Sequence, residues 1–279
     1  MKLIFHHQDH KYVSEGYPEL IWVSVSQLVG FFKNPFDAEA ISKKVSKDKK
    51  SKWYGMNPEE IRWIWKSKAD RSCDNGTKYH AIQEAEILSC DVIDIEGQEV
   101  TVRAPLINEG LKIAPDQKLQ DNCIYPEHLV YLKTFGVCGQ VDRPEILNKV
   151  LRITDYKSNE KLDMESFYNP YTGKHKMMQP PLQHLQDCNF VHYELQQSLY
   201  AYMILKHNPW LTLGDLLIEH VIFETEGVDQ WGDPIVKLDE FENPIVQDVQ
   251  YHKARFLKNE VELMLDWLKK NRHNLRKKS

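Results

Sequence analysis

The chain has 279 residues, of which 42% are hydrophobic and 28% are charged, and its formal net charge is −5. These proportions are typical of a folded, soluble domain, and a chain of this length can bury a sizeable core. No run of about 18 apolar residues occurs, so the sequence predicts no membrane span. The first residues lack the apolar core of a secretion signal, and we expect a cytoplasmic protein.

The chain begins with a stretch rich in β-forming residues at positions 3–13, which predicts a strand. Ser24 and Gln27 then have the spacing of a capping box, a pair in which each side chain accepts a backbone N–H of the other residue. We expect a short helix that starts at this pair and ends at Phe32.

Residues 37–70 have a helical pattern that is broken between Gly55 and Pro58. Six lysines gather before the break, and they could bind DNA phosphates without sequence preference or form a solvated helix face. They are Lys43, Lys44, Lys47, Lys49, Lys50 and Lys52. The negative net charge does not exclude DNA, because local patches matter more than the sum.

Four aromatic residues follow these lysines: Trp53, Tyr54, Trp63 and Trp65. They could stack on the bases of a single strand, or they could pack into the protein. Since tryptophans on a helix usually pack inward, we favour the second interpretation.

The next motif is Gly-Thr-Lys-Tyr-His-Ala-Ile-Gln-Glu at residues 76–84. Thr77 predicts an N-cap, so we expect a helix from about Thr77 to Ser89. His80 and Glu84 are four residues apart and therefore share one helical face. Taken alone, such a histidine is more often a core or surface residue than a metal ligand.

Residues 137–147 and 150–157 are rich in β-formers and are separated by Asn148-Lys149. If this pair is a two-residue turn, Asp142 faces Asp155, with Cβ atoms about 5 Å apart. The period of two along a strand then puts Lys157 on the face of Asp155. We expect an edge or a bulge near Pro144, because proline has no N–H for a ladder.

Two carboxylates at this distance repel each other unless a proton or a cation lies between them. A hard divalent ion such as Mg²⁺ binds carboxylate oxygens, acidifies water and stabilises charge on a phosphate. Lys157 could orient the water or neutralise that charge. The alternative is an ordinary hairpin with an Asp–Lys pair. Glu127, before a strand at 129–132, could add a carboxylate, although a solvated strand-end glutamate is the more common case.

The remaining elements follow in chain order. They are a hairpin around Glu96-Gly97, an ambiguous segment at 104–122, a polar excursion at 159–191, a helix at 192–207, a strand at 216–224 and a helix at 248–271. A connection as long as 159–191 is typically functional or disordered. In the helix at 192–207, Gln196 and Tyr200 share a face.

The order G-T-x-x-H-x-x-x-E, G-x-x-D, D-x-K and Q-x-x-x-Y resembles the RecB-like branch of the PD-(D/E)XK nuclease superfamily. The stretch 22–29 and the later Asn34-Pro35-Phe36 are similar to phage and mitochondrial genome maintenance exonucleases. The resemblance implies an α/β, restriction-endonuclease-like core, with a mixed central β-sheet flanked by helices. We expect residues 76–279 to form this core, and residues 1–75 to form an N-terminal strand and helical extension packed on it.

The resemblance also assigns roles to individual residues. It places metal ligands at His80, Asp142 and Asp155, at the backbone carbonyl of Tyr156, and at Glu84 directly or through water. The catalytic lysine falls on Lys157, and Gln196 and Tyr200 fall on the motif that positions the strand or this lysine. Val141 stands where the superfamily name has proline, a departure that the RecB-like branch often shows.

Some members of this branch hold an iron–sulfur cluster with four cysteines, three of them after the Q-x-x-x-Y helix. This chain has Cys73, Cys90, Cys123, Cys138 and Cys188, so no cysteine follows Tyr200. We therefore expect neither an iron–sulfur cluster nor a zinc site. The scatter predicts reduced, mostly buried thiols.

The sequence thus predicts a deoxyribonuclease that depends on Mg²⁺ or Mn²⁺. By resemblance, we expect an exonuclease that acts on single-stranded DNA or DNA ends in replication, repair or recombination. The resemblance to phage proteins also agrees with a phage origin. The alternatives are a structure-specific endonuclease on flaps or branched DNA, and a catalytically silent nucleic-acid-binding module on a nuclease fold.

Overall fold

A computed structural model describes residues 2–6, 11–17 and 19–275 of the chain. It has a mixed α/β fold around a central seven-stranded sheet with the order β18-β15-β12-β11-β8-β5-β4. The β12–β15 and β5–β8 pairs are parallel and the other pairs are antiparallel. The strands are β4 (Val92–Ile95), β5 (Gln98–Val102), β8 (Cys123–Ile124), β11 (Arg143–Leu147), β12 (Val150–Lys157), β15 (Thr212–Phe223) and β18 (Val246–Ala254).

Two smaller sheets and two ribbons lie beside the central sheet. One sheet has the order β2-β1-β7-β6 and the other the order β3-β10-β9. Their strands are β1 (Lys2–His6), β2 (Lys11–Glu15), β6 (Leu106–Asn108), β7 (Leu111–Ile113), β3 (Val23–Ser24), β9 (His128–Leu132) and β10 (Val137–Val141). The ribbons are β13 (Tyr168–Asn169) with β14 (Lys174–His175), and β16 (Thr225–Val228) with β17 (Pro234–Val236).

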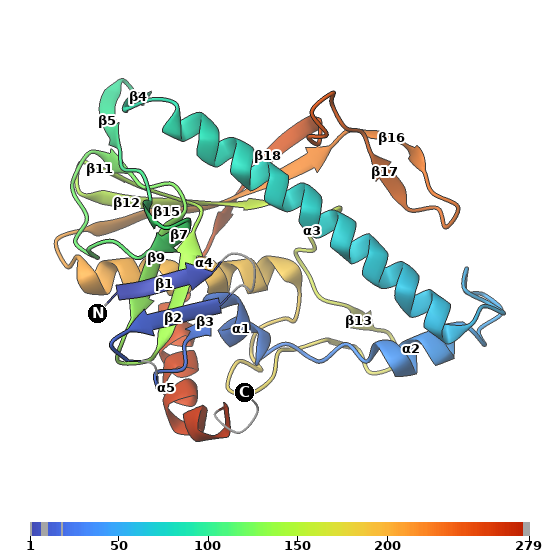
Figure 1. Ribbon diagram of the computed structural model, residues 1–279. Helices are drawn as coiled ribbons and strands as arrows, with labels where there is room; N and C mark the ends of the chain where they lie inside the picture. The colour runs from blue at the N-terminus through green and yellow to red at the C-terminus, as the bar shows by residue number, and fades with distance from the viewer. Residues whose placement is uncertain (1, 7–10, 18, 276–279) are drawn as a thin grey trace.

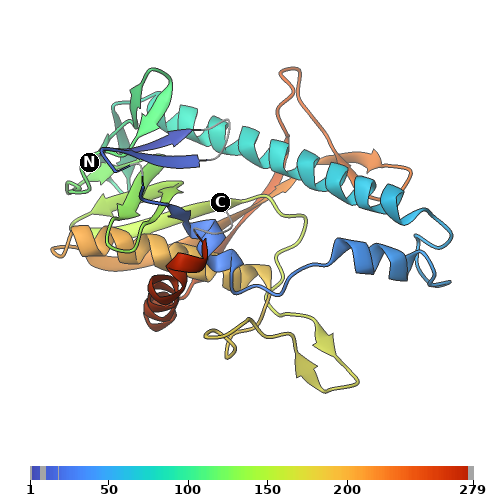
Figure 2. The same ribbon diagram turned by 60° about the horizontal axis from the view of Figure 1, so that its bottom comes forward.

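Helices cover both sides of the central sheet (Figures 1 and 2). They are α1 (Val25–Gly30), α2 (Ala38–Val45), α3 (Pro58–Leu88), α4 (Asn189–His207) and α5 (Lys258–Leu275). The helix α3 crosses one side, while α4 and α5 pack on the other. The main hydrophobic core lies on the α4 side, where Leu195 and Leu199 join Leu151 and Ile153 of β12. No helix in the described part of the chain is long and apolar enough to cross a membrane.

The helix α3 is longer than the sequence predicts. It begins at Pro58 after an Asn57 cap, so the expected cap at Thr77 is wrong, and it passes the expected domain boundary at residues 75–76 without a break. Gly76 lies where α3 approaches the end of β12, because a Cβ there would come within 2.9 Å of Ser158 Oγ. Glycine at this position marks a close crossing instead of a helix start.

The predicted hairpin at Asn148-Lys149 is confirmed. Both turn residues have positive φ, 53° and 66°, as a two-residue type I′ turn requires. The register pairs Arg143 with Thr154, which continues to Asp142 opposite Asp155. The edge expected at Pro144 is wrong, because β11 has a neighbour on both sides. The long strand is instead interrupted at Asp142, between β10 and β11.

Two other expectations are corrected. The ambiguous segment 104–122 contains the hairpin β6–β7, and the expected helix 248–271 is a strand up to Ala254, followed by α5 from Lys258. The sequence of β18 lacks a helical apolar stripe, and its pairing with β15 extends the central sheet. The capping box at Ser24 and Gln27 is confirmed at the start of α1.

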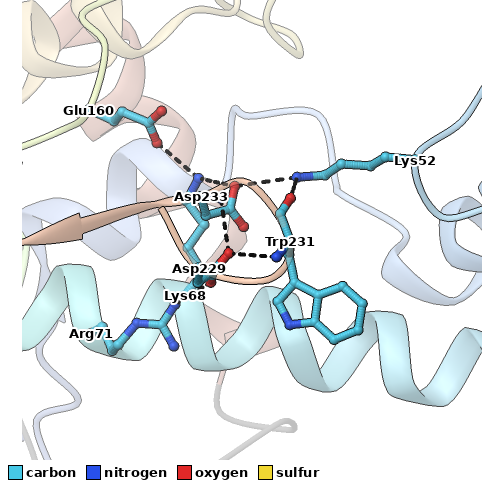
Figure 3. A network of polar contacts seen from close by, with 7 residues as sticks. All are labelled: Lys52, Lys68, Arg71, Glu160, Asp229, Trp231 and Asp233. Carbon is cyan, nitrogen blue, oxygen red and sulfur yellow. Dashed lines mark hydrogen bonds and ion pairs between the residues drawn. The ribbon is translucent and has the colours of Figure 1, made fainter. Parts of the chain in front are cut away.

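The first part of α3 forms an arm with α2 and the tip of the β16–β17 ribbon. Trp53, Ile61 and Ile64 make a small core of their own, against which Trp231 of the ribbon tip packs. Polar contacts add to this core (Figure 3): Lys52 and Lys68 both reach Asp233, at 3.4 and 3.1 Å. The arm therefore has its own apolar and ionic contacts, away from the main core.

Candidate metal centre

Four segments meet at one end of the central sheet. α3 contributes His80 and Glu84, the turn before β9 contributes Glu127, and the β10–β11 break contributes Asp142. The strand β12 contributes residues 155–157. Asp142 lies between two ladders, because β10 ends at Val141 and β11 begins at Arg143, so its backbone pairs in neither. The backbone N–H of Tyr156 donates instead to Asp142 Oδ2 over 2.8 Å.

Three side chains form the core of the site. His80 Nδ1 lies 3.5 Å from Glu127 Oε1 and 3.6 Å from Asp142 Oδ1. Within the described residues, one ligand atom from each of these three side chains lies within 4.8 Å of the other two. Ligand atoms around a Mg²⁺ or Mn²⁺ ion are roughly 3–4 Å apart, given bonds of about 2.1 Å. The two distances from His80 Nδ1 already fall within this range.

The donor set fits a divalent ion. Glu127 and Asp142 are both less than one-tenth exposed, and Glu127 Oε1 is a buried oxygen that has no hydrogen-bond partner. A buried carboxylate oxygen without a donor is costly unless a cation approaches it. Two carboxylates and one imidazole are suitable ligands for Mn²⁺ and acceptable ligands for Mg²⁺.

The backbone of Tyr156 orients the histidine. His80 Nε2 lies 3.2 Å from the Tyr156 carbonyl oxygen. With its proton on Nε2, the ring donates to this carbonyl and leaves the Nδ1 lone pair facing both carboxylates, which is the usual arrangement of a metal-binding histidine. In this tautomer Tyr156 holds the ligand in place, whereas the sequence predicts its carbonyl as a ligand itself.

Without a cation, the site takes up protons. Burial lowers the pKa of His80, but Asp142 and Glu127 outweigh it and raise the pKa to about 9. Burial also raises the pKa of Asp142. A protonated His80 thus occupies the place of the positive charge, and binding of a metal must displace this proton.

Asp155 and Lys157 form the second half of the site, as the period of two predicts. Their side chains make an ion pair, and Lys157 Nζ also donates to the Tyr156 carbonyl over 3.3 Å. Burial raises the pKa of Asp155 to about 6, although Lys157 opposes the shift. Asp155 lies beside the three-ligand group and not within it. The Lys157 ammonium also lies 4.9 Å from the centre of the Tyr193 ring.

Gln196 and Tyr200 lie side by side on α4, and Gln196 Nε2 donates to the Tyr200 hydroxyl over 3.3 Å. Tyr200 is buried and packs on Gly139 of β10, where an added Cβ would lie 2.6 Å from the tyrosine ring. The glycine of G-x-x-D thus makes room for the tyrosine of Q-x-x-x-Y. This contact holds β10, and with it the break at Asp142, against α4.

Glu84 does not join the three-ligand group. Its Oε1 accepts from Lys112 Nζ of β7 at 2.9 Å, and the same ammonium lies 4.0 Å from Glu127 Oε2. From the sequence, Glu127 is expected to add a carboxylate only as the less common case, and Lys112 belongs to none of the motifs. The position of Glu127 after Pro126, at the start of a strand, was the available signal, whereas nothing local marked Lys112.

The five lysines predicted to contact DNA, Lys43, Lys44, Lys47, Lys49 and Lys50, are all exposed on or just after α2. Lys43 pairs with Glu39 within the helix, and Lys52 is held by the ribbon tip. Of the aromatic residues, Trp53 is buried in the arm as favoured, while Trp63 and Tyr54 are more than half exposed.

No protein-family model matches the chain, and no curated protein sequence matches it significantly.

Proposed function

We propose that this protein is a deoxyribonuclease that depends on Mg²⁺ or Mn²⁺ and has a restriction-endonuclease-like core of the PD-(D/E)XK type. One observation carries the proposal: the His80–Glu127–Asp142 group lies beside the Asp155–Lys157 pair. The two are joined by the hydrogen bond from the backbone N–H of Tyr156, on β12, to Asp142. An ordinary hairpin with an Asp–Lys pair needs no half-buried histidine beside it and no unpartnered carboxylate oxygen. In the hydrolysis of a phosphodiester, a divalent cation and a fixed ammonium can both stabilise the charge that develops on the phosphate.

His80, Glu127 and Asp142 would hold the ion. When bound, Mg²⁺ or Mn²⁺ acidifies water and stabilises negative charge on the phosphate. Asp155 lies close enough to fix the lysine, and its carboxylate raises the pKa of Lys157 despite the opposing effect of burial. Lys157 therefore stays charged, which suits it to orient the attacking water or to neutralise charge on the phosphate and does not suit it to act as a base.

The proposed substrate is single-stranded DNA or a DNA end, cut as an exonuclease, and this part rests on the resemblance to the RecB-like branch. The exposed lysines of α2 support a nucleic acid as the substrate, because they add positive charge to an otherwise acidic chain. Trp63 and Tyr54 are exposed close to them in the sequence and offer surfaces for base stacking. The runner-up is a structure-specific endonuclease on flaps or branched DNA.

The test uses the purified protein with end-labelled single-stranded and double-stranded DNA in Mn²⁺, Mg²⁺ or a chelator. Lys157→Ala should lower the cleavage rate by at least about 100-fold, the usual effect of losing one charge-stabilising donor, and should leave DNA binding intact. Lys161→Ala is the matched control. Lys161 lies four residues after Lys157, is exposed and pairs with Asp163.

Shortening from one end that requires the metal and Lys157 supports the exonuclease, and its direction gives the polarity. Internal cuts favour the endonuclease. Binding without cleavage of any substrate would move the assignment to a silent binding module, and cleavage by Lys157→Ala at the wild-type rate would refute the site.

A further inference from the structure

Lys112 is a buried lysine next to the candidate metal centre that none of the sequence motifs includes. Its side chain is only 9% exposed, which means that almost all of it has left water. A lysine is rarely buried to this extent unless a carboxylate balances it. Here Glu84 lies 2.9 Å from Nζ and Glu127 lies 4.0 Å from it.

The position of Lys112 is set by a strand that contains none of the nuclease-like motifs. Lys112 belongs to β7, which pairs with β1, and its pairing partner there is Phe5. This small sheet brings the lysine to the same group of side chains that α3 and the β10–β11 break reach from other directions. The position of Lys112 is therefore set by strand pairing and is not a chance contact of a flexible surface side chain.

Glu127 faces two different positive centres. Its Oε1 points toward His80 Nδ1, 3.5 Å away, where the ion would bind, and its Oε2 is 4.0 Å from the Lys112 ammonium. In nucleases with two metal ions, the ions lie about 3.5–4 Å apart and each needs oxygen ligands of its own. Glu84 and one oxygen of Glu127 are such ligands for a second ion, but Lys112 already occupies the space between them.

The charges of the site balance with one divalent ion. Lys112 offsets Glu84, and the ion pair on β12 is neutral as well. With a neutral His80, the remaining charge is that of two carboxylates, Glu127 and Asp142, which one divalent ion cancels. A second divalent ion would have to bind next to a buried ammonium, and both repulsion and space oppose it.

We propose that the site takes one divalent metal ion and that Lys112 occupies the place of a second one. Lys112 is a positioning residue, since it holds Glu84 and Glu127 in place. This inference rests on the proposed metal site but does not require that the protein cuts DNA. It makes a simple prediction: removal of the ammonium opens a second site for a cation.

A route for that cation exists. A cavity of about 250 Å³ is lined by Lys112, Glu127, His128 and Arg103, among others. Glu127 and Lys112 both line this cavity, so a hydrated ion could reach the Glu127 carboxylate through it once the ammonium is removed. The variant Lys112→Met keeps most of the side-chain volume, so it removes the charge with little change in packing.

The experiment counts bound Mn²⁺ ions per chain by titration with electron paramagnetic resonance, in which the signal of free Mn²⁺ is lost on binding. We expect one tight ion in the wild type and two in Lys112→Met. Adding Glu84→Gln to Lys112→Met should return the count to one, because the second ion loses a ligand. Lys66→Met is the matched control, since Lys66 is exposed and pairs with Asp70, and it should leave the count at one.

Two tight ions in the wild type would overturn the inference without any variant, even if Lys112→Met folds poorly. A folded Lys112→Met that still binds one ion would overturn it as well. No tight ion in the wild type would instead refute the metal site on which the proposed function depends, so the two failures can be told apart.

Discussion

The backbone N–H of Tyr156 donates a hydrogen bond to Asp142 Oδ2 over 2.8 Å and ties the interruption between β10 and β11 to strand β12. This bond fixes one oxygen of the carboxylate and leaves Oδ1 turned toward His80 Nδ1. Asp142 is therefore oriented before any ion binds. A preoriented ligand binds an ion more tightly, because less conformational freedom is lost.

Glu127 and Glu84 should differ in their importance for metal binding. We expect Glu127→Gln to weaken Mn²⁺ binding at least about tenfold, since it removes the negative charge of a carboxylate whose unpartnered oxygen faces His80. Glu84→Gln should weaken it less than threefold, because the Glu84 carboxylate binds Lys112 instead. Isothermal titration calorimetry with Mn²⁺ measures both. The reverse order would show that Glu84 is a ligand, directly or through water, as the resemblance implies.

The pairing of Asp142, Asp155 and Lys157 could be predicted because it depends on local rules. A two-residue turn sets the register, and the alternation of side chains along a strand does the rest. The structure confirms the turn and the register. The interruption at Asp142 could not be predicted in this way, because it arises where the chain leaves one sheet for another.

The length of α3 and the neighbours of Glu127 were harder to predict. Asn75-Gly76-Thr77 has the composition of a helix boundary, and glycine costs a helix roughly 1 kcal/mol relative to alanine. Packing at both ends of α3, by Ile61 in the arm and by Tyr79 on the sheet, overrides this preference. Lys112 reaches Glu127 only through the pairing of β1 with β7, and no local pattern in the sequence specifies a contact of that range.

Gly139→Ala should destabilise the protein by about 1–3 kcal/mol, the usual cost of overpacking a core. The new methyl group would lie 2.6 Å from the ring of Tyr200, which is buried, and 3.2 Å from Val25. Urea denaturation measures the change. Gly30→Ala is the control, because a Cβ at this position in α1 meets nothing within 4 Å. Equal stability of the two variants would contradict the proposed contact between β10 and α4.

Asp233→Ala should loosen the tip of the β16–β17 ribbon. Asp233 is largely buried and binds both Lys52 and Lys68, so its loss removes one carboxylate partner from each lysine (Figure 3). Lys68 keeps its pair with Glu160, and Lys52 keeps its bond to the Trp231 carbonyl. We expect amide hydrogen exchange in residues 225–237 to become about tenfold faster, as a local loss of roughly 1.4 kcal/mol implies.

The matched control is Asp70→Ala, whose carboxylate pairs with Lys66 on the exposed side of α3. Exposed pairs of this kind contribute little, so exchange at the ribbon should stay unchanged. Unchanged exchange in Asp233→Ala would show that the apolar contacts of Trp231 hold the ribbon without help from the ion pairs.

His192 should make the protein less stable in mild acid. Burial and the nearby Lys33 lower its pKa to about 4, although its hydrogen bond to Asp187 opposes the shift. In the unfolded chain a histidine titrates near 6.5, so between pH 6.5 and 4 the unfolded state binds the proton more readily and the folded state loses stability. The stability that neutral His192 provides is therefore complete above about pH 6.5 and is lost on acidification. By pH 5 the loss is about 1–2 kcal/mol. Urea denaturation at pH 7 and pH 5 should therefore show a smaller decrease in the free energy of unfolding for His192→Gln than for the wild type. Equal decreases would mean that His192 takes up its proton in the folded protein as easily as in the unfolded chain.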